Sequence, residues 1–261
     1  MKLFDKYDVM TFSLLLSVLF CVSCIKEERE ECPCRLIVDL ANVDSASVSS
    51  VDIVLADDEG FVYMGERMAD SYLADEIILV PRDELYLNVS YGADDMMSAA
   101  GLRIPDGEAC PPVYLYSALI DASESEFVRK EVSMRKCHCV MKIYLEGDEF
   151  PFEMSIKGGV CGYDALGFPL SGAFNCLPEW IEGSVYSVTL PRQKDASLLL
   201  EINDGTDVLK TFALGEYIKA CGYDWTDADL KDLTVGIDYA RTQIIISVQG
   251  WDEVYEFDIV I

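Results

Sequence analysis

The chain has 261 residues, of which 51% are hydrophobic, and its 47 acidic and 20 basic residues give a net charge of −27. This apolar content is enough to build packed cores. The strong negative charge repels phosphate backbones and anionic membrane surfaces, so composition argues against nucleic acid as a partner and against direct membrane binding.

The first 24 residues have the pattern of an export signal. An uncharged stretch from Val9 to Ser23 is shorter than the roughly 20 apolar residues that a membrane span needs. It ends at Cys24 in a sequence that resembles a bacterial lipobox, although Cys21 stands where that pattern usually has leucine. We therefore predict a lipoprotein signal peptide over residues 1–23 and a lipid on Cys24. The alternative is a buried N-terminal helix with two core cysteines.

A charged tether follows the lipidation site, because residues 26–31 are all charged and cannot bury apolar surface. Lys26-Glu27-Glu28 resembles the signal that sends Bacteroidota lipoproteins to the outer face of the outer membrane, and an ordinary spacer is the alternative. We expect a tether over residues 24–32 and a surface-facing protein that is attached to the outer membrane through its lipid.

Beyond the tether, short runs with period-two alternation predict strands over most of the chain. Turn signals separate them, such as Asp57–Gly60 and Asn203–Gly205, the second of which predicts a hairpin. Helix is scarce, with short helices expected at Glu216–Cys221 and Thr226–Leu230. The expected strands are Arg35–Leu40, Val51–Ala56, Phe61–Gly65, Glu76–Val80, Leu85–Tyr91, Val113–Leu119, Glu126–Met134, His138–Leu145, Glu153–Ile156, Val185–Leu190, Ser197–Ile202, Val208–Leu214, Leu233–Tyr239, Ile244–Val248 and Val254–Ile261.

So many strands exceed the seven to nine of one ordinary sandwich. The sequence therefore predicts an all-β chain with two tandem β-sandwich domains and few short helices. We place the domains at 33–134 and 135–261, because a charged run at residues 129–131 gives way to a fresh apolar strand there. A Cys-Xaa-Cys triplet opens each half, Cys32-Pro33-Cys34 in the first and Cys137-His138-Cys139 in the second.

Cysteines are numerous for a chain of this size, and two readings of them stay open. Without Cys21 and Cys24, eight remain: Cys32, Cys34, Cys110, Cys137, Cys139, Cys161, Cys176 and Cys221. An even number in an exported chain permits disulfides, whereas buried free cysteines behave as small apolar residues. One hypothesis is a bridge that joins the pair Cys32/Cys34 to the pair Cys137/Cys139 and fixes the angle between the domains.

No catalytic set emerges from the sequence. The single histidine, His138, lies between two cysteines in an apolar strand, and the three side chains cannot converge on one ion because neighbouring strand residues face opposite sides. The acidic run from Asp224 to Asp232 fails the EF-hand spacing. We therefore predict no enzyme, no metal site and no cofactor apart from the covalent lipid on Cys24.

Aromatic residues leave a choice between a binding face and a core. Tyrosines in the first half could stack on sugar rings, and alternating strands of a sandwich core would use them equally well. We favour core or cross-strand packing for them. The tyrosines concerned are Tyr63, Tyr72, Tyr86, Tyr91, Tyr114 and Tyr116.

Several features together resemble the FimB-type fimbrial anchoring subunits of Bacteroidota. They are the lipobox, Cys32-Pro33, two β domains, the Asp204-Gly205 hairpin and the stretch Gln243–Trp251 before a last strand. The resemblance implies transthyretin-like sandwiches in a lipidated subunit that holds a pilus at the outer membrane. Cys34 and the triplet at 137–139 are not features of that family.

The resemblance also covers tip and stalk subunits of such pili. Stalk subunits lose an N-terminal segment to an arginine-specific protease before strand exchange, and Arg29 and Arg35 lie in the corresponding region. Subunits of this kind assemble when a partner's strand completes an open sheet edge. The last run offers Tyr255, Phe257, Ile259 and Ile261 as one face of a candidate donor strand, although we favour pairing within its own sheet.

The sequence therefore favours a structural subunit of a cell-surface pilus, anchored by its lipid and active in cell adhesion. Its expected partners are other fimbrial subunits. The alternative is a surface lipoprotein that binds glycan or a host protein, and an enzyme is the weakest of the three readings because no nucleophile and base stand out.

Overall fold

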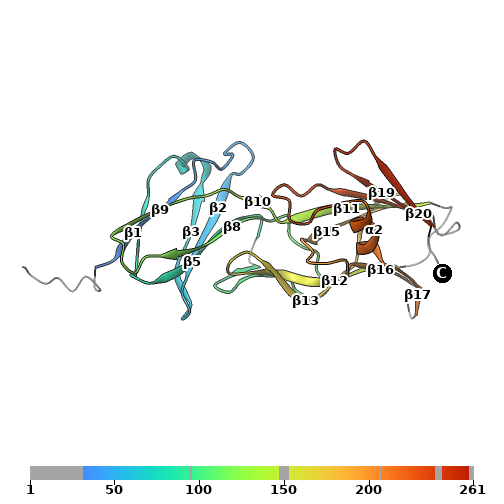
Figure 1. The fold of residues 1–261 in the computed structure, drawn as a ribbon, viewed down its shortest axis with the longest axis horizontal. Helices are drawn as coiled ribbons and strands as arrows, with labels where there is room; N and C mark the ends of the chain where they lie inside the picture. Colours follow the sequence, from blue (N-terminus) through green and yellow to red (C-terminus); the bar gives the residue numbers. More distant parts are fainter. Residues whose placement is uncertain (1–31, 94–95, 147–152, 206, 239–242, 259–261) are drawn as a thin grey trace, which may run out of the picture.

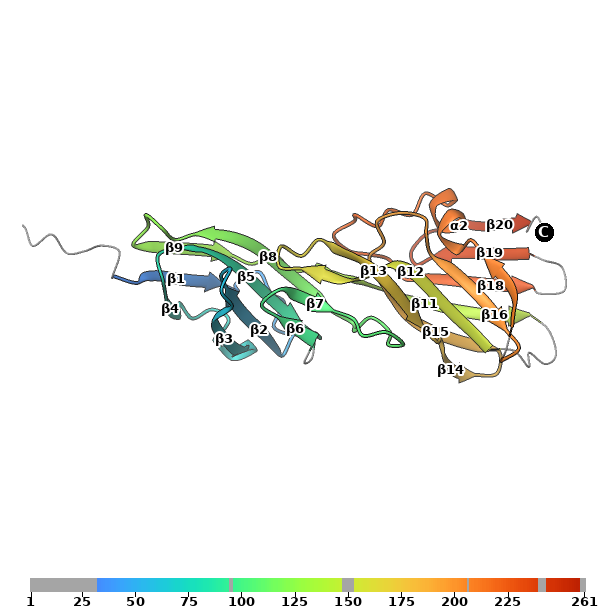
Figure 2. The same cartoon turned by 90° about the horizontal axis from the view of Figure 1, so that it is seen from below.

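The computed structural model describes residues 32–93, 96–146, 153–205, 207–238 and 243–258. Regular structure in these ranges is almost entirely β-strand, arranged in four sheets that form two sandwiches. The predicted all-β architecture of two tandem sandwiches is therefore confirmed. Figures 1 and 2 show the two sandwiches end to end in an elongated molecule.

The first sandwich packs a three-stranded sheet against a five-stranded sheet. In the smaller sheet, β1 lies between the other two strands, antiparallel to β4 and parallel to β9. A short 3₁₀ helix, η2 (Ala69–Ser71), follows β3. The strands in sheet order are β4 (Ile77–Val80), β1 (Cys34–Asp39) and β9 (Phe127–Glu131), and then β10 (Arg135–Lys136), β8 (Tyr114–Asp121), β5 (Glu84–Tyr91), β2 (Ser50–Ala56) and β3 (Phe61–Met68).

Alternation builds the core of this sandwich. Leu85, Leu87 and Val89 of β5 point inward and are fully buried, because successive strand residues face opposite sides of a sheet. The expected turn at Asp57–Gly60 is present, with the Asp57 carboxylate accepting from the backbone N–H groups of Glu59 and Gly60 at 2.8 and 2.9 Å. Gly60 has a φ of 146°, which suits glycine.

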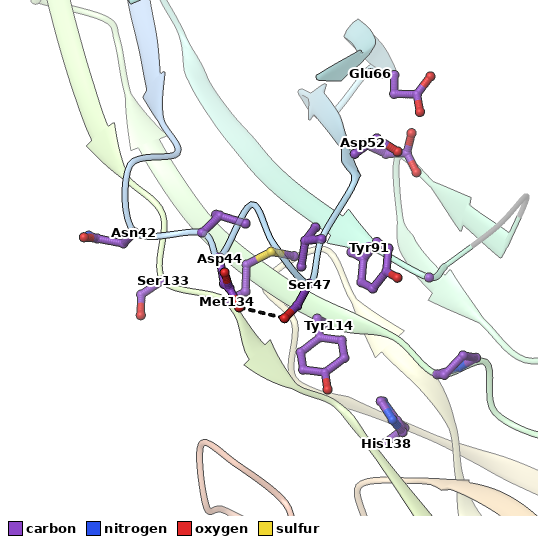
Figure 3. Close-up of a pocket in the computed structure, with 15 residues that line it drawn as sticks. Asn42, Asp44, Ser47, Asp52, Glu66, Tyr91, Tyr114, Ser133, Met134 and His138 are labelled. Atoms are coloured by element: carbon purple, nitrogen blue, oxygen red, sulfur yellow. Dashed lines mark hydrogen bonds between the residues drawn. The ribbon is translucent and has the colours of Figure 1, made fainter. Parts of the chain in front are cut away.

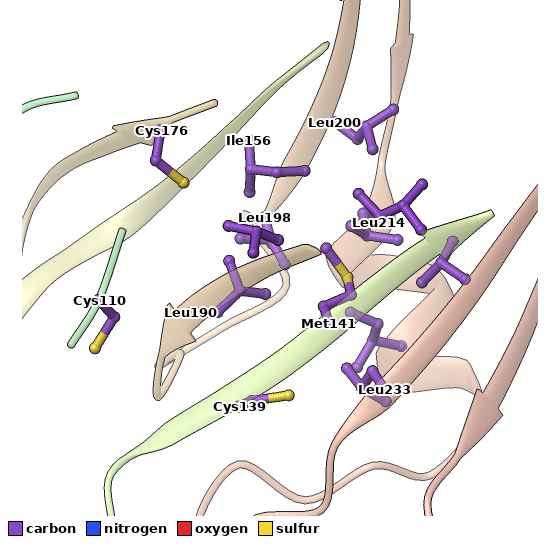
Figure 4. Close-up of a cluster of buried hydrophobic side chains, with 14 of the residues drawn as sticks. Cys110, Cys139, Met141, Ile156, Cys176, Leu190, Leu198, Leu200, Leu214 and Leu233 are labelled. Atoms are coloured by element: carbon purple, nitrogen blue, oxygen red, sulfur yellow. The ribbon is translucent and has the colours of Figure 1, made fainter. Parts of the chain in front are cut away.

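The second sandwich packs two six-stranded sheets, and Figure 4 shows part of the core between them. One sheet follows the order β14 (Glu179–Glu182), β15 (Val185–Pro191), β11 (His138–Glu146), β18 (Leu233–Asp238), β19 (Gln243–Val248) and β20 (Val254–Asp258). The other follows β17 (Val208–Phe212), β16 (Leu199–Asn203), β12 (Glu153–Asp164), β7 (Gly101–Arg103) and β6 (Met97–Ser98), with β13 (Pro169–Cys176) paired to β12.

One predicted helix is confirmed and one is wrong. The helix α2 (Leu214–Ala220) covers most of the expected range Glu216–Cys221. Residues 226–230 contain a turn at Thr226 and an isolated β-bridge from Asp229 to Lys136 instead, and the Asp224 carboxylate accepts from the N–H and the hydroxyl of Thr226. The buried guanidinium of Arg192 also donates to the carbonyls of Trp225 and Ala228 and so holds the backbone of this segment in its non-helical path.

The short strands β6 and β7 lie in the first half of the sequence but belong to the second sandwich. Residues 101–103 pair with β12, and Leu102 and Ile104 are buried in the second core. The first core, by contrast, is built from residues between Cys34 and Val132. The domain division at 33–134 and 135–261 stays a prediction. The segment 97–104, here called the crossing segment, precedes the predicted boundary but belongs to the second sandwich.

The two described ends of the chain lie far apart. β1 begins at the outer end of the first sandwich, and β20 runs toward the outer end of the second (Figure 2). Within the described ranges, no helix is long and apolar enough to cross a membrane.

Candidate interaction sites

The last strand lies at a sheet edge. Among the described strands β20 pairs only with β19, in antiparallel register from Gln243–Asp258 to Ser247–Val254. Tyr255 and Phe257 pack against the second core, and the Phe257 ring lies 5.1 Å from that of Tyr217 in α2. The described part of the candidate donor strand is thus paired within its own sheet, whereas Ile259 and Ile261 lie outside the described residues.

The opposite edge of the same sheet carries exposed apolar side chains. All four residues of β14 are exposed, including Trp180 and Ile181 at 60% and 50%. The register between β14 and β15 shifts after Trp180, and its indole N–H donates to the carbonyl of Gly183 at 3.0 Å. This edge was not predicted, because Trp180 and Ile181 stand next to each other and break the alternation that marks a half-buried strand.

Of the predicted lipidation site and the two candidate protease sites near the N-terminus, only Arg35 lies within the described residues. Cys24 and Arg29 lie outside the described residues. Arg35 is the second residue of β1 and is paired on both sides, opposite Leu79 of β4 and Phe127 of β9. Its backbone N–H donates to the carbonyl of Glu126 at 3.0 Å, so the peptide around Arg35 is held inside a sheet.

The two Cys-Xaa-Cys triplets do not come together. Cys34 is buried in the first core, whereas Cys137 and Cys139 are buried in the second, and Cys32 is exposed. All eight cysteines of the described chain are free thiols, and seven of them are buried. Burial raises the pKa of Cys139 and that of Cys176 to about 12, so these thiols are protonated at neutral pH.

A hydrogen-bonded network fixes the strand that joins the sandwiches. Arg192 is 3% exposed, and its guanidinium donates to the carbonyls of Lys136, Trp225 and Ala228 at 2.5, 2.7 and 3.3 Å. The ammonium of Lys136 pairs with Asp232 at 2.7 Å. The hydroxyl of Tyr163 donates to the carbonyl of Cys137 and accepts from the backbone N–H of Arg192.

His138 faces away from its two cysteine neighbours, as the strand geometry predicts. Its Nδ1 lies 3.1 Å from the carbonyl oxygen of Val113 and its ring packs edge-on against Tyr114 at 5.4 Å. Burial lowers the pKa of His138, so the imidazole is neutral at pH 7. Because the carbonyl only accepts, Nδ1 carries the proton and Nε2 keeps its lone pair.

A pocket of about 950 Å³ opens at the end of the first sandwich that faces the second (Figure 3). The rings of Tyr91 and Tyr114 lie 6.2 Å apart at 39° on its wall, and His138 follows them. The lining contains acidic, hydroxyl and amide side chains and no lysine or arginine. It consists of Asn42, Val43, Asp44, Ser47, Val48, Ser50, Asp52, Glu66, Tyr91, Gly92, Pro112, Tyr114, Ser133, Met134 and His138.

The carboxylates of this pocket differ in their surroundings. Asp44 accepts from the Ser47 hydroxyl at 2.7 Å and from the Ala46 N–H at 3.1 Å, and these bonds lower the pKa of Asp44. Asp52 and Glu66 lie directly opposite each other on β2 and β3. Sequence reasoning missed both, since residues this far apart in the chain meet only through the strand register.

Most of the tyrosines singled out from the sequence serve the core. Tyr72 is 4% exposed and donates its hydroxyl to the carbonyl of Val48, while Tyr63 and Tyr116 pack against the first core. Tyr91 packs against the first core, its ring contacts that of Tyr114, and both residues line the pocket. Tyr86 borders a separate, smaller pocket that is otherwise lined by acidic residues.

In the described part of the chain, no group of three or more histidine, cysteine or acidic side chains is arranged to hold a metal ion. The acids of the 224–232 run are used locally. Asp224 caps Thr226, Asp229 pairs with Lys231 at 2.6 Å, and Asp232 pairs with Lys136.

Neither a family model nor a curated protein matches the sequence. Three solved structures share the fold, each at 12% identity. A candidate polysaccharide-binding protein from Bacteroides thetaiotaomicron matches with a TM-score of 0.60 over 86% of this chain and 98% of that chain. A candidate adhesin from Bacteroides ovatus gives 0.56 over 86% and 95%. The fimbrial anchor protein Mfa2 from Porphyromonas gingivalis gives 0.57 over 84% and 98%. The resemblance to fimbrial anchoring subunits is thus confirmed at the level of the fold.

Proposed function

We propose that this chain is a lipid-anchored structural subunit of a cell-surface pilus and that it stands at the base. The observation that carries the proposal is the polarity of the molecule. β1, the first described strand after the predicted lipidation site, begins at the outer end of the first sandwich, whereas β20 lies in the sandwich at the other end (Figures 1 and 2). A membrane-held chain with this shape presents its second sandwich to partners.

The fold shared with the anchor Mfa2 supports the same function. The contact with the next subunit would use a sheet edge, because an edge strand carries unpaired N–H and C=O groups that a partner strand can complete. Both edges of the sheet from β14 to β20 lie in the second sandwich, at the opposite end of the molecule from the start of β1.

The place of β1 favours an anchor over a stalk subunit. A stalk subunit gives up its N-terminal segment, whereas β1 is the central strand of its sheet and buries Leu36 and Val38 completely or nearly so. A protease must bind an extended, accessible peptide, and Arg35 is held between two neighbouring strands. Retention of β1 keeps the tether connected to the folded body.

The experiment compares Cys24→Ala with Cys21→Ala in cells that carry the complete pilus. We expect Cys24→Ala to prevent acylation, so that the chain and its pili appear in the medium, while Cys21→Ala leaves both on the cells. Immunoblots of cell and medium fractions and electron microscopy of pili provide the readout. Retention of the Cys24→Ala chain in the membrane would contradict the lipid anchor. Release of the chain with pili still attached would contradict the basal role.

A further inference from the structure

The pocket at the end of the five-stranded sheet is longer than a site for a single side chain. Its key residues follow the ends of four neighbouring strands: Glu66 on β3 lies opposite Asp52 on β2, Asp52 lies opposite Ser90 on β5, and Tyr91 lies opposite Tyr114 on β8. Because Ser90 and Tyr91 are successive strand residues, the two acids and the two tyrosines belong to opposite faces of the sheet, and they meet at its end, where all four line the pocket. Neighbouring strands lie about 4.8 Å apart, so this row extends over roughly 14 Å. Figure 3 shows the same order, with the acids at one end, Tyr114 and His138 at the other, and Tyr91 between.

The two kinds of side chain in this row select for a particular chemistry. Tyr91 and Tyr114 are half-buried and tilted by 39°, so they offer a stepped aromatic wall to the apolar face of a ring. The carboxylates of Asp52 and Glu66 and the Nε2 atom of His138 are hydrogen-bond acceptors, and they suit a ligand that is rich in hydroxyl donors. Ser47, Ser50 and Asn42 add polar groups to the lining.

Charge narrows the class of ligand further. The lining holds Asp44, Asp52 and Glu66 and neither lysine nor arginine, so sulfate, phosphate and carboxylate groups would be repelled. A cationic peptide is the other chemistry that carboxylates attract. Only Asp52 and Glu66 lie together at one end of the row, whereas Asp44 is bonded to Ser47 and Ala46, and a single ammonium or guanidinium group bound by the Asp52 and Glu66 pair would leave the aromatic end unused. The volume of about 950 Å³ lies at the upper end of the range for ligand sites.

We propose that this pocket binds an uncharged oligosaccharide, with Tyr91 and Tyr114 stacking on sugar rings and with Asp52 and Glu66 accepting hydrogen bonds from hydroxyl groups. This site acts whether or not the chain anchors a pilus, because none of its residues belongs to β14, β20 or the tether.

The test is isothermal titration calorimetry on the purified mature chain with a fixed panel of probes. Neutral gluco-, manno- and galacto-hexasaccharides are compared with a hexamer of galacturonic acid, a heparin hexasaccharide and a hexa-arginine peptide. We expect at least one neutral probe to bind, and the two acidic probes to bind at least tenfold more weakly. Binding of no neutral probe, equal binding of an acidic one, or binding of hexa-arginine alone would overturn the proposal.

Matched variants locate the bound sugar. Glu66→Gln changes an exposed side chain and Tyr91→Ala removes one stacking ring, and each should weaken the neutral probe at least tenfold. Glu131→Gln on β9 and Tyr144→Ala on β11 remove the same groups from exposed positions outside the pocket, and they should leave affinity unchanged. Circular dichroism verifies that each variant is folded. Equal losses in the control pair, or full affinity in Glu66→Gln, would refute the assignment.

Discussion

Two buried thiols make the stability of the folded protein depend on pH in the alkaline range. Cys139 and Cys176 are at most 1% exposed, and burial raises the pKa of each from 9.0 to about 12. The unfolded chain, in which these thiols are in water, loses its protons near pH 9. The folded state therefore binds more protons than the unfolded state above pH 9, and its stability must fall as the pH rises.

We predict that the free energy of unfolding of the reduced chain decreases between pH 9 and pH 11. Each of these two thiols contributes a slope of about 1.4 kcal/mol per pH unit in that range and nothing below pH 8. Urea unfolding at stepwise pH measures the slope. The variant Cys139→Ala, compared with itself across the same range, should show a shallower decline. An identical slope in the variant would mean that the Cys139 thiol ionises in the folded state, contrary to its burial.

Single elements of the fold depend on glycines whose role is steric. β12 is longer than the expected strand Glu153–Ile156 and continues to Asp164 through register shifts near Gly158 and Val160. At its end, Gly162 has a φ of +144°, and a Cβ atom there would collide with the backbone of Leu102 in β7. This glycine lets β7 pair closely with β12, which brings β6 and β7 into the second sandwich.

We predict that Gly162→Ala destabilises the protein by about 3 kcal/mol or more, because unfavourable backbone torsion adds to a clash with backbone that cannot move aside. Gly183→Ala is the matched control. Gly183 also has a positive φ, +52°, but a Cβ atom there meets no other atom within 4 Å, so the expected loss is about 1 kcal/mol. The midpoints of urea unfolding compare the two. Equal losses of stability in the two variants would show that the close approach of Gly162 to β7 does not contribute to the free energy of unfolding.

These strands also show what could be predicted from the sequence. Alternation of apolar and polar residues was sufficient to predict strands such as Leu85–Tyr91 and Leu233–Asp238, because one face of each strand is buried. Prediction failed for β6 and β7, which are two and three residues long, and for β13, whose run contains Gly172 and little alternation. Short strands that are fixed by long-range pairing leave no periodic signal in the chain.

At the scale of the whole molecule, the pocket and the junction arise from register between distant segments. His138 was visible in the sequence as the only histidine, and Tyr91 and Tyr114 were visible as aromatics. Asp52 and Glu66 gave no signal, because they lie 14 positions apart in the chain and only the β2–β3 pairing sets them opposite each other. The same holds for Arg192, whose guanidinium contacts the connecting strand and the 225–228 turn.

The crossing segment makes the two sandwiches unequal as independent folding units. Leu102, Ile104 and Val113 come from the first half of the sequence and are at most 4% exposed in the second core. Burial of three such side chains stabilises a domain by roughly 6 kcal/mol, which is comparable with the total stability of about 5–15 kcal/mol of a typical domain. The second core therefore needs residues that precede the predicted boundary at 134.

We predict that residues 135–261, expressed alone, do not form a cooperative fold, whereas residues 93–261 do. The shorter fragment lacks β6, β7 and the three buried side chains, so the face of β12 that pairs with β7 is left open. Thermal unfolding followed by near-ultraviolet circular dichroism distinguishes the two, because only fixed aromatic packing gives a signal and a sharp transition. If both fragments melted with the same cooperativity, β6, β7 and the side chains that accompany them would not be needed for the second sandwich to fold. The division at 134/135 would then be a true domain boundary.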